Sequence, residues 1–475
     1  MARFNLKKDV SMSQRLRAPL TRLALYGCIS AGLMACGGGG GGEEPGPGAG
    51  AADASVSAEQ APLSQPGQHA SRAPDSLPEP ADAPQMTQQP QQPQEPGQPQ
   101  PQQQPQQPQA PQEPQLPVPQ TTQAPQPRAS APTLAGCELF PQDAIFNTRV
   151  DDRSRFPAHA RSAQWIASVG AGVRFRADWG RSEDPTQRTA YYGIPINIVN
   201  GTSGTTQWPT LRYDFSTAGL RGMAGWPHES DCAVSAGGGF DIMRGCNAVP
   251  PEQRRFPFPR QGALTEGGTC NDPATCGDHH LLVVEAGACR LWESYSTYNL
   301  GGQWYSLATA AWNLNSMAMR PHRWTAADAS GMPMTPFLVK AAEVAQGEIR
   351  HALRVTFRDA VVAREFVWPA RHGAGGDTPG GIPFGALLRL RSDFVIPSHW
   401  NQQARAIATA AKQYGLYVAD LGMDFYVQGE PSVAWEPATF SQLGGIALSD
   451  MEFVDLGAIT RDPRFSPDSM AARWR

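Results

Sequence analysis

Residues 280–285 (HLLVVE) and 289–295 (CRLWESY) are the two stretches that decide the fold. Each has the length of a β-strand and is rich in the branched and aromatic side chains that strands favour. Only Ala286-Gly287-Ala288 separates them, which is short enough for a hairpin turn. The pair therefore predicts an antiparallel hairpin at the centre of the domain.

The sequence on both sides of this hairpin continues the strand pattern. Further strands are expected at residues 193–199, 349–357, 361–368, 386–391, 417–419, 425–428 and 453–454. Helices are expected at 158–169, 401–414 and 437–443, the second with Ser398 as N-cap and Gly415 after its end. Residues 222–277 look like one long irregular stretch. Many strands, few helices and no βαβ rhythm predict an all-β or β-rich α+β fold, an antiparallel β-sandwich or jelly roll with one or two peripheral helices.

Composition divides the chain into three parts. Residues 1–35 have a basic beginning and an apolar run from 23 to 35, too short to span a bilayer but typical of a secretory signal. Residues 36–134 are rich in Gly, Pro and Gln and hold almost no residue that could build a core, so a disordered, extended tether is expected there. The proline-rich part could also be a ligand for a partner domain. Residues 135–475 have the composition of a single β-rich globular domain.

The end of the apolar run is specific. Leu33-Met34-Ala35-Cys36 resembles the lipobox of bacterial lipoproteins. The resemblance implies that Cys36 is lipidated and becomes the new N-terminus, with the lipid bilayer as a partner. It also implies a place in the bacterial cell envelope, at the outer membrane or cell surface. An ordinary signal peptide that contains a cysteine is the alternative.

Charge and motifs exclude several classes of function. The formal net charge is −4, so no basic field points to nucleic acid. The sequence has no Gly-x-Gly-x-x-Gly after a strand, no Walker A lysine motif and no Gly-x-Ser-x-Gly elbow. Asp420 and Asp424 flank Gly422 and could offer oxygens to calcium, but their spacing fits no EF-hand loop. We therefore expect no cofactor and no metal.

The cysteines predict disulfides. Of eight cysteines, six lie beyond residue 136, and an exported chain meets an oxidising compartment. The pairs Cys232–Cys246 and Cys270–Cys276 flank loop-like sequence, which leaves Cys137–Cys289 as a staple from the start of the domain to a central strand. Zinc is the competing interpretation, although the sequence has neither Cys-x-x-Cys nor a paired histidine spacing.

Several blocks of the domain, taken in order, resemble a family of uncharacterised secreted bacterial proteins, and the resemblance extends over most of the region from Cys137 to Asp455. The blocks are GDHHLLVVE (277–285), WNLNS (312–316), RPHRWTAADASGMPMTPFLV (320–339), EVAQGEIRHALRVTF (343–357), VWPARH (367–372), PFGALLRLR (383–391) and YGLYVADLGMDFYVQGEP (414–431). His279 stands where the family usually has arginine, and Leu421 where it has asparagine. The resemblance implies the extent of the domain and no activity.

Four residues are candidates for catalysis. Asp278 and His280 lie at a strand start on one face, Glu293 lies on the next strand, and His351 lies on another. A carboxylate beside a histidine suits general acid–base chemistry, and two carboxylates suit glycoside hydrolysis. Histidine with arginine or tyrosine would suit a lyase acting beside a uronate. The structural alternatives are an Asx-capped turn at Asp278, a core histidine at position 351 and a structural ion pair of Glu293 with Arg354 or Arg389.

Candidate substrate-binding residues are Trp292, Tyr295, Trp304, Arg354 and His372. The aromatic ones fall in one short region, and aromatic faces stack on sugars. Burial of the same rings in the core is the alternative. Asp328 could line a site or, in our preferred interpretation, cap a backbone turn.

Together these patterns predict a surface lipoprotein whose domain acts on or binds an extracellular polymer, a carbohydrate, as a hydrolase or a lyase. The alternatives are a non-catalytic carbohydrate-binding module and a structural envelope protein.

Overall fold

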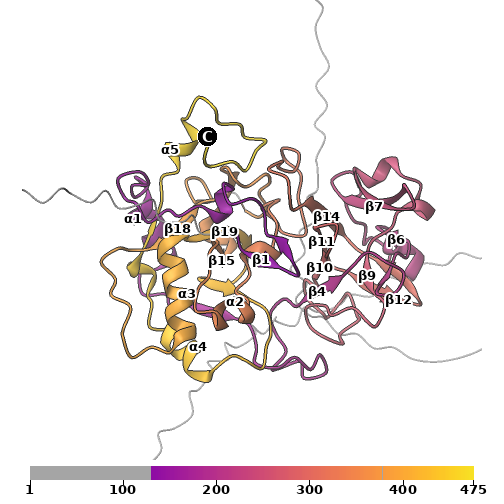
Figure 1. Ribbon diagram of the computed structural model, residues 1–475, viewed down its shortest axis with the longest axis horizontal. Coiled ribbons are helices and arrows are strands. Elements are labelled where there is room, and N and C mark those ends of the chain that lie inside the picture. Colours follow the sequence, from indigo (N-terminus) through magenta and orange to yellow (C-terminus); the bar gives the residue numbers. More distant parts are fainter. Residues whose placement is uncertain (1–129, 377, 475) are drawn as a thin grey trace, which may run out of the picture. The chain divides into compact units, whose positions relative to one another are not determined.

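The computed structural model describes residues 130–376 and 378–474. The expected signal segment, Cys36 and nearly all of the expected tether lie outside the described residues. Within them the protein is β-rich, as predicted, and its strands form several small sheets (Figure 1). No sheet of the described part closes on itself.

The predicted hairpin is confirmed as the centre of a four-stranded sheet. Strands β10 (Leu281–Glu285) and β11 (Arg290–Tyr295) pair antiparallel, with Leu281 opposite Ser294 and Glu285 opposite Arg290. On the outer side of β11 lies β14 (Ala308–Asn313), antiparallel, and beside β10 lies β4 (Ile196–Val199), parallel. All five residues of β10 are buried because both faces of this sheet are covered.

The larger sheet has six strands in the order β21-β18-β19-β15-β20-β3. Their bounds are β21 (Met451–Phe453), β18 (Leu387–Leu390), β19 (Leu416–Leu421), β15 (Leu353–Phe357), β20 (Tyr426–Gln428) and β3 (Arg176–Asp178). Helix α3 (Gln402–Gln413) packs against β18 and lies beside this sheet in Figure 1. Asn401, rather than the expected Ser398, caps it by accepting a hydrogen bond from the backbone N–H of Ala404 at 2.9 Å.

Two features differ from the sequence prediction. The sheets are mixed rather than antiparallel, since β4–β10, β15–β19 and β20–β3 are parallel pairs. Each of these pairs joins strands distant in sequence, which local patterns cannot register. The stretch expected to be irregular contains a hairpin, β7 (Asp231–Ala236) with β8 (Gly239–Arg244). Its turn, Gly237-Gly238, has two residues of positive φ and so suits a hairpin.

The remaining elements are short. The strands are β1 (Thr133–Leu134), β2 (Cys137–Glu138), β5 (Thr206–Gln207), β6 (Leu211–Arg212), β9 (Phe258–Pro259), β12 (Tyr298–Leu300), β13 (Gln303–Tyr305), β16 (Val362–Phe366) and β17 (Ile382–Phe384). The helices are α1 (Ser162–Val169), α2 (Ala341–Ala345), α4 (Pro437–Leu443) and α5 (Gly457–Thr460). Helix α4 matches its predicted bounds, and α1 begins four residues later than expected, after a turn. None of the described helices has the length and apolarity needed to cross a bilayer.

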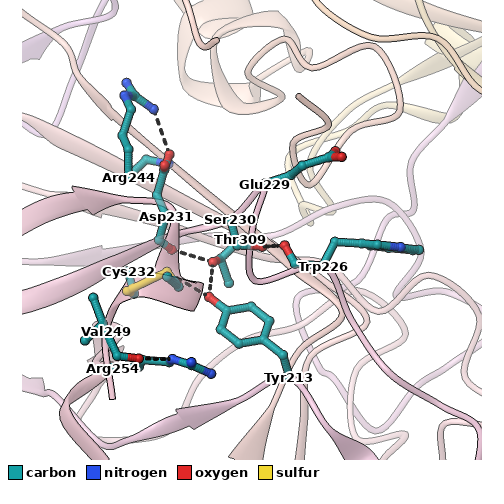
Figure 2. Close-up of a disulfide and its surroundings, with 12 residues drawn as sticks. Tyr213, Trp226, Glu229, Ser230, Asp231, Cys232, Arg244, Val249, Arg254 and Thr309 are labelled. Atoms are coloured by element: carbon teal, nitrogen blue, oxygen red, sulfur yellow. Dashed lines mark hydrogen bonds and ion pairs between the residues drawn. A yellow bond between two sulfur atoms is a disulfide. The ribbon is translucent and has the colours of Figure 1, made fainter. Parts of the chain in front are cut away.

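The cysteines form the three pairs expected from the sequence: Cys137–Cys289, Cys232–Cys246 and Cys270–Cys276. Figure 2 shows the surroundings of the second pair. There, the buried Asp231 carboxylate pairs with Arg244 at 2.9 Å, and the Tyr213 hydroxyl lies 2.6 Å from that of Thr309. Asp231 also attaches the β7–β8 hairpin to β14, because its carboxylate accepts the backbone N–H of Ala311 at 2.8 Å.

Alternating side chains of the central hairpin enter different cores. Val284 and Leu291 pack in the core shared with the six-stranded sheet. Val283 and Trp292 point to the other side, into a core with Tyr213 and the Cys232–Cys246 pair. The first face, which also carries His280 and Tyr295, therefore brings the hairpin to the six-stranded sheet.

Candidate functional site

A histidine–glutamate pair lies at the entrance of β10. His280 is 2% exposed, and its Nδ1 lies 2.6 Å from Oε2 of Glu266, a turn residue. Its Nε2 lies 3.0 Å from the carbonyl oxygen of Ala327. Both ring nitrogens face acceptors, so both carry hydrogen and the ring is an imidazolium.

Each residue of this pair stabilises the charged form of the other. Burial alone would lower the pKa of His280, but the charge and hydrogen bond of Glu266 outweigh it and raise the pKa to about 9. Burial likewise opposes ionisation of Glu266, yet the charge of His280 holds the pKa of that carboxyl below its usual value. At neutral pH the pair is ionic.

A second ion pair comes from the six-stranded sheet. Arg354 of β15 is completely buried and contacts the Asp328 carboxylate and the Gln428 side-chain oxygen. It also lies 3.6 Å from Oδ2 of Asp420. Asp328 is held in turn by the backbone N–H of Ser330 at 2.7 Å, the expected turn cap. Arg354 thus pairs with Asp328 and also lies within ion-pair distance of Asp420.

Asp420 reaches the cluster through an irregularity in the sheet. The register between β15 and β19 shifts at Val355/Thr356, which places Asp420 opposite Thr356. Its side chain is 21% exposed. Burial, reinforced by the negative charge of Asp328, raises the pKa of Asp420 to about 7. Bulges of this kind redirect side chains beside active sites.

Two more carboxyls complete the cluster. Asp178 ends β3, opposite Gln428, and burial with the charge of Glu266 raises its pKa to about 6. Asp278 is exposed, yet partial desolvation of its carboxyl raises the pKa of that group. The charge of His280 opposes this rise. The cluster therefore holds carboxyls that ionise at different pH values.

Tyrosines stand among these carboxyls. The Tyr295 ring is half-buried, 5.5 Å from the His280 ring, and its hydroxyl bonds to Asp278. Tyr192 is 43% exposed, and partial burial, followed by the charges of Asp178 and Tyr426, raises the pKa of its hydroxyl. The acidic cluster therefore has aromatic side chains beside it.

Glu293 is not part of this accessible cluster, contrary to the sequence prediction. It is completely buried, and its carboxylate accepts the backbone N–H of Met334 at 2.9 Å and of Thr335 at 2.7 Å. The Thr335 hydroxyl donates to it as well, at 2.7 Å. It pairs with neither Arg354 nor Arg389. Glu293 anchors a loop to β11 and cannot touch a ligand from this position.

His351 is also separate from the cluster, so the four predicted catalytic residues do not form one site. It is completely buried, with Nε2 2.8 Å from Oε2 of Glu343 and 3.1 Å from Nζ of Lys340. Its Nδ1 lies 2.8 Å from the carbonyl oxygen of Ala352. The alternative of a satisfied core histidine fits this arrangement.

The structure places the five predicted binding residues in different environments. Tyr295 and Arg354 belong to the cluster. Trp292 is completely buried, with its indole N–H bonded to Glu285 at 3.0 Å, so it cannot stack on a ligand. Trp304 is half-buried and stacks on Phe258 at 4.0 Å, and His372 bonds through Nδ1 to the carbonyl oxygen of Ala329 at 2.8 Å. Among the described residues, no hydrogen bond or ring contact joins Trp304 or His372 to the carboxyls of the cluster.

Two adjoining cavities lie elsewhere on the domain. They have volumes of about 400 and 420 Å³ and share His159, Trp165, Val367 and Pro383. The indole N–H of Trp165 bonds to the carbonyl oxygen of Gly380 and that of Trp368 to the carbonyl oxygen of Ser469, and the Trp165 ring stacks on His159 at 4.6 Å. This trough was not anticipated from the sequence.

Comparisons with family models, curated proteins and solved structures found no match for this chain. Among residues 130–376 and 378–474, no group of three or more His, Cys, Asp or Glu is arranged to hold a metal ion.

Proposed function

We propose that this domain is an acid–base hydrolase of an extracellular carbohydrate, held at the bacterial cell envelope through lipidated Cys36. The observation that carries the proposal is the cluster of Asp420, Asp278 and the Glu266–His280 pair: the pKa of Asp420 is raised to about 7, that of Glu266 is lowered, and the charge of His280 opposes the rise in the pKa of Asp278. Environments that push the pKa values of neighbouring groups apart supply an acid and a base at one pH. The lipobox and the secretory signal support the location.

Asp420 is the proposed general acid. With a pKa raised to about 7 it retains a proton near neutrality. It gives that proton to the glycosidic oxygen as the bond from this oxygen to the anomeric carbon breaks. Water adds to the anomeric carbon, and the Asp278 carboxylate accepts the proton that the water loses. The products are two sugar chains, each with a new hydroxyl group.

The buried ion pairs hold these carboxyls in place. His280, fixed by Glu266, favours the ionised form of Asp278, and Arg354, fixed by Asp328, lies 3.6 Å from Asp420. Hydrolysis is favoured over uronate cleavage by a lyase, because a lyase needs a free cation at the uronate carboxylate. Both cations of the cluster are buried and already paired with carboxylates.

The test is a screen of the full chain in detergent against a polysaccharide panel, reading reducing ends released and ligand bound. Activity should fall strongly in Asp420→Asn and Asp278→Asn. Asp393→Asn is the matched control, since Asp393 is exposed and, within the described part of the chain, forms its ion pair with Arg391 alone, at 2.5 Å. Release of reducing ends that survives both site variants would overturn the proposal.

A non-catalytic binding module is the second candidate. The trough beside Trp165 and Trp368 favours it, because aromatic walls can hold a sugar face. Binding without release, abolished by Trp368→Ala but retained in Asp420→Asn, would support this function instead. In fold terms, we propose that the two larger sheets form a sandwich, supported by the core they share.

A further inference from the structure

Asp328 and Asp420 are two carboxyls that face one buried cation. Nη2 of Arg354 contacts Oδ2 of Asp328 and lies 3.6 Å from Oδ2 of Asp420. Arg354 and Asp328 are completely buried, whereas the Asp420 side chain is 21% exposed. Burial raises the pKa of both carboxyls, and the positive charge of Arg354 opposes the rise in each. The two carboxyls therefore compete for the same cation, and the one that loses keeps its proton to higher pH.

Hydrogen bonds decide which carboxyl wins this competition. Asp328 accepts the backbone N–H of Ser330 at 2.7 Å, the Ser330 hydroxyl and the Arg354 guanidinium. Three donors on one carboxylate favour its ionised form. Among the described residues, Asp420 accepts a single hydrogen bond, from the backbone N–H of Leu421 at 2.8 Å. The proton is therefore expected on Asp420, which is also the carboxyl that a ligand can reach.

The short segment that carries Asp328 is fixed to the surrounding strands. The carbonyl oxygen of Ala327 lies 3.0 Å from Nε2 of His280, at the entrance of β10. The backbone N–H of Ser330 also donates to the carbonyl oxygen of Ala419 at 3.1 Å, and Ala419 directly precedes the proposed acid on β19. This segment therefore engages both buried cations of the cluster, and its attachment to β19 keeps the Asp328 carboxylate in place.

We infer that Asp328 is a positioning residue of this site: by holding Arg354, it keeps the proton on Asp420. The inference deepens the proposed hydrolase function, on which it rests, by naming the residue that regulates the proposed acid. Asp328 cannot touch a substrate itself, because it is completely buried. Without its charge, Arg354 would pair with Asp420, which would then be ionised near neutrality and have no proton to donate.

Other charged and titratable groups face Asp420 as well. They are Asp278 and His280 at the entrance of β10, and Tyr295 of β11. The hydrogen bonds of His280 go to Glu266 and to a backbone carbonyl, so they do not involve the Asp328 side chain. Asparagine has the shape of aspartate and can accept through its amide oxygen. Asp328→Asn therefore removes one charge beside Arg354 and leaves these neighbours unchanged.

The experiment follows the Asp420 carboxyl directly, by carbon NMR of the full chain in detergent with isotope-labelled aspartate. The Asp420 signal is the one that Asp420→Asn removes. Asp328→Asn should lower the midpoint of its titration by roughly one to three pH units, because Arg354 then pairs with Asp420. Adding Arg354→Gln to Asp328→Asn should raise the midpoint again, because the freed cation is gone. The alkaline limb of kcat/KM should move with the midpoint in each variant that cleaves a glycan.

Asp231→Asn is the matched control, because Asp231 is also completely buried and pairs with a completely buried arginine, Arg320, beside the Cys232–Cys246 pair. It should lower thermal stability and leave the Asp420 midpoint unchanged. An Asp420 midpoint that is unchanged or raised in Asp328→Asn would overturn the inference, as would a double variant that titrates as low as the single one. If the midpoint falls as expected and the limb of kcat/KM does not follow it, Asp328 still controls the proton and the proposed hydrolase mechanism is wrong.

Discussion

Two buried histidine–glutamate pairs in this domain have almost the same geometry and opposite surroundings. His280 lies 2.6 Å from Glu266, and His351 lies 2.8 Å from Glu343. Around His351, Lys340 adds a cation at 3.2 Å from the same Glu343 oxygen. Around His280, additional carboxyls gather, at Asp278 and Asp420.

The difference appears in the carboxyl pKa values. Burial opposes ionisation of Glu343, but the charges of Lys340 and His351 lower its pKa to about 2, so this carboxyl is ionised and held by both neighbours. Near His280 the additional carboxyls share cations that already pair with other carboxylates, Arg354 with Asp328 and His280 with Glu266, and the pKa of Asp420 rises to about 7. A histidine beside a carboxylate is therefore not by itself a site. What favours a functional site near His280 is that accessible carboxyls lie there in addition to the one that pairs with the histidine.

The largest expected effect is a loss of activity when a carboxyl beside the His280–Glu266 pair is removed. Asp420→Asn removes the proposed acid and should reduce turnover on a cleaved glycan by roughly 10²–10⁴-fold. The fold should persist, since the lost carboxyl is protonated near neutrality. Circular dichroism and thermal unfolding of the same preparation check this. A parallel loss of activity and thermal stability would assign Asp420 a structural role.

The converse substitution is Glu343→Gln. It leaves Lys340 and His351 buried without their shared carboxylate, which should destabilise the fold by about 3–5 kcal/mol. Denaturant unfolding measures the change, and activity per folded molecule should stay at the level of the unmodified chain. If activity falls while the unfolding midpoint is unchanged, the comparison between the two pairs is wrong.

Lowering the pH should decrease the stability of the fold through Glu343 and increase it through Asp420. The pKa of Glu343 is lowered from 4.5 to about 2. Its ionised carboxyl therefore stabilises the folded state fully above pH 4.5, and this stabilisation is lost as the pH falls toward 2. The pKa of Asp420 is raised from 3.8 to about 7, so the folded state binds this proton more tightly and stability falls as the pH rises from 4 to 7.

Unfolding free energies measured between pH 4 and 8 test this second trend. The free energy of unfolding of Asp420→Asn relative to that of the unmodified chain should be higher at pH 8 than at pH 4, by on the order of 2 kcal/mol. Asp393→Asn serves again as the exposed control and should show no such gain. An identical pH profile for Asp420→Asn and the unmodified chain would mean that this carboxyl is not perturbed.

The smallest effect is on the pH profile of the rate. Asp420 must be protonated and Asp278 ionised, so kcat/KM should be bell-shaped with its alkaline limb near pH 7. Above that limb the rate should fall about tenfold per pH unit. A rate that stays level to pH 9 would assign the proton to another group.

Sequence patterns alone identified the central hairpin, the helix at 437–443, the three cysteine pairs and part of the cluster. Asp278, His280 and Tyr295 could be found because they flank one hairpin. Glu266 comes from a turn in the irregular stretch, and no local signal marks it. Asp178 reaches the cluster only through the parallel pairing of β3 with β20, which joins residues far apart in sequence.

Glu293 shows the opposite error. Its position on a strand next to Asp278 and His280 made it a reasonable candidate, and strand alternation placed it on the correct face. What excludes it is the loop containing Met334 and Thr335, which covers that face and donates hydrogen bonds to the carboxylate. Burial by a distant loop cannot be read from the strand itself.

The disulfide between Cys137 and Cys289 has a mechanical consequence. It connects the beginning of the domain to the turn between β10 and β11, across a sequence separation of 152 residues. Tension applied from the N-terminal side would pass through this covalent link into the central sheet. The chain between the two cysteines, including the β7–β8 hairpin, would carry none of that load. A domain pulled by its N-terminal end would therefore transmit the force to the four-stranded sheet at Cys289, and residues 138–288 should extend under that force only after the disulfide is reduced.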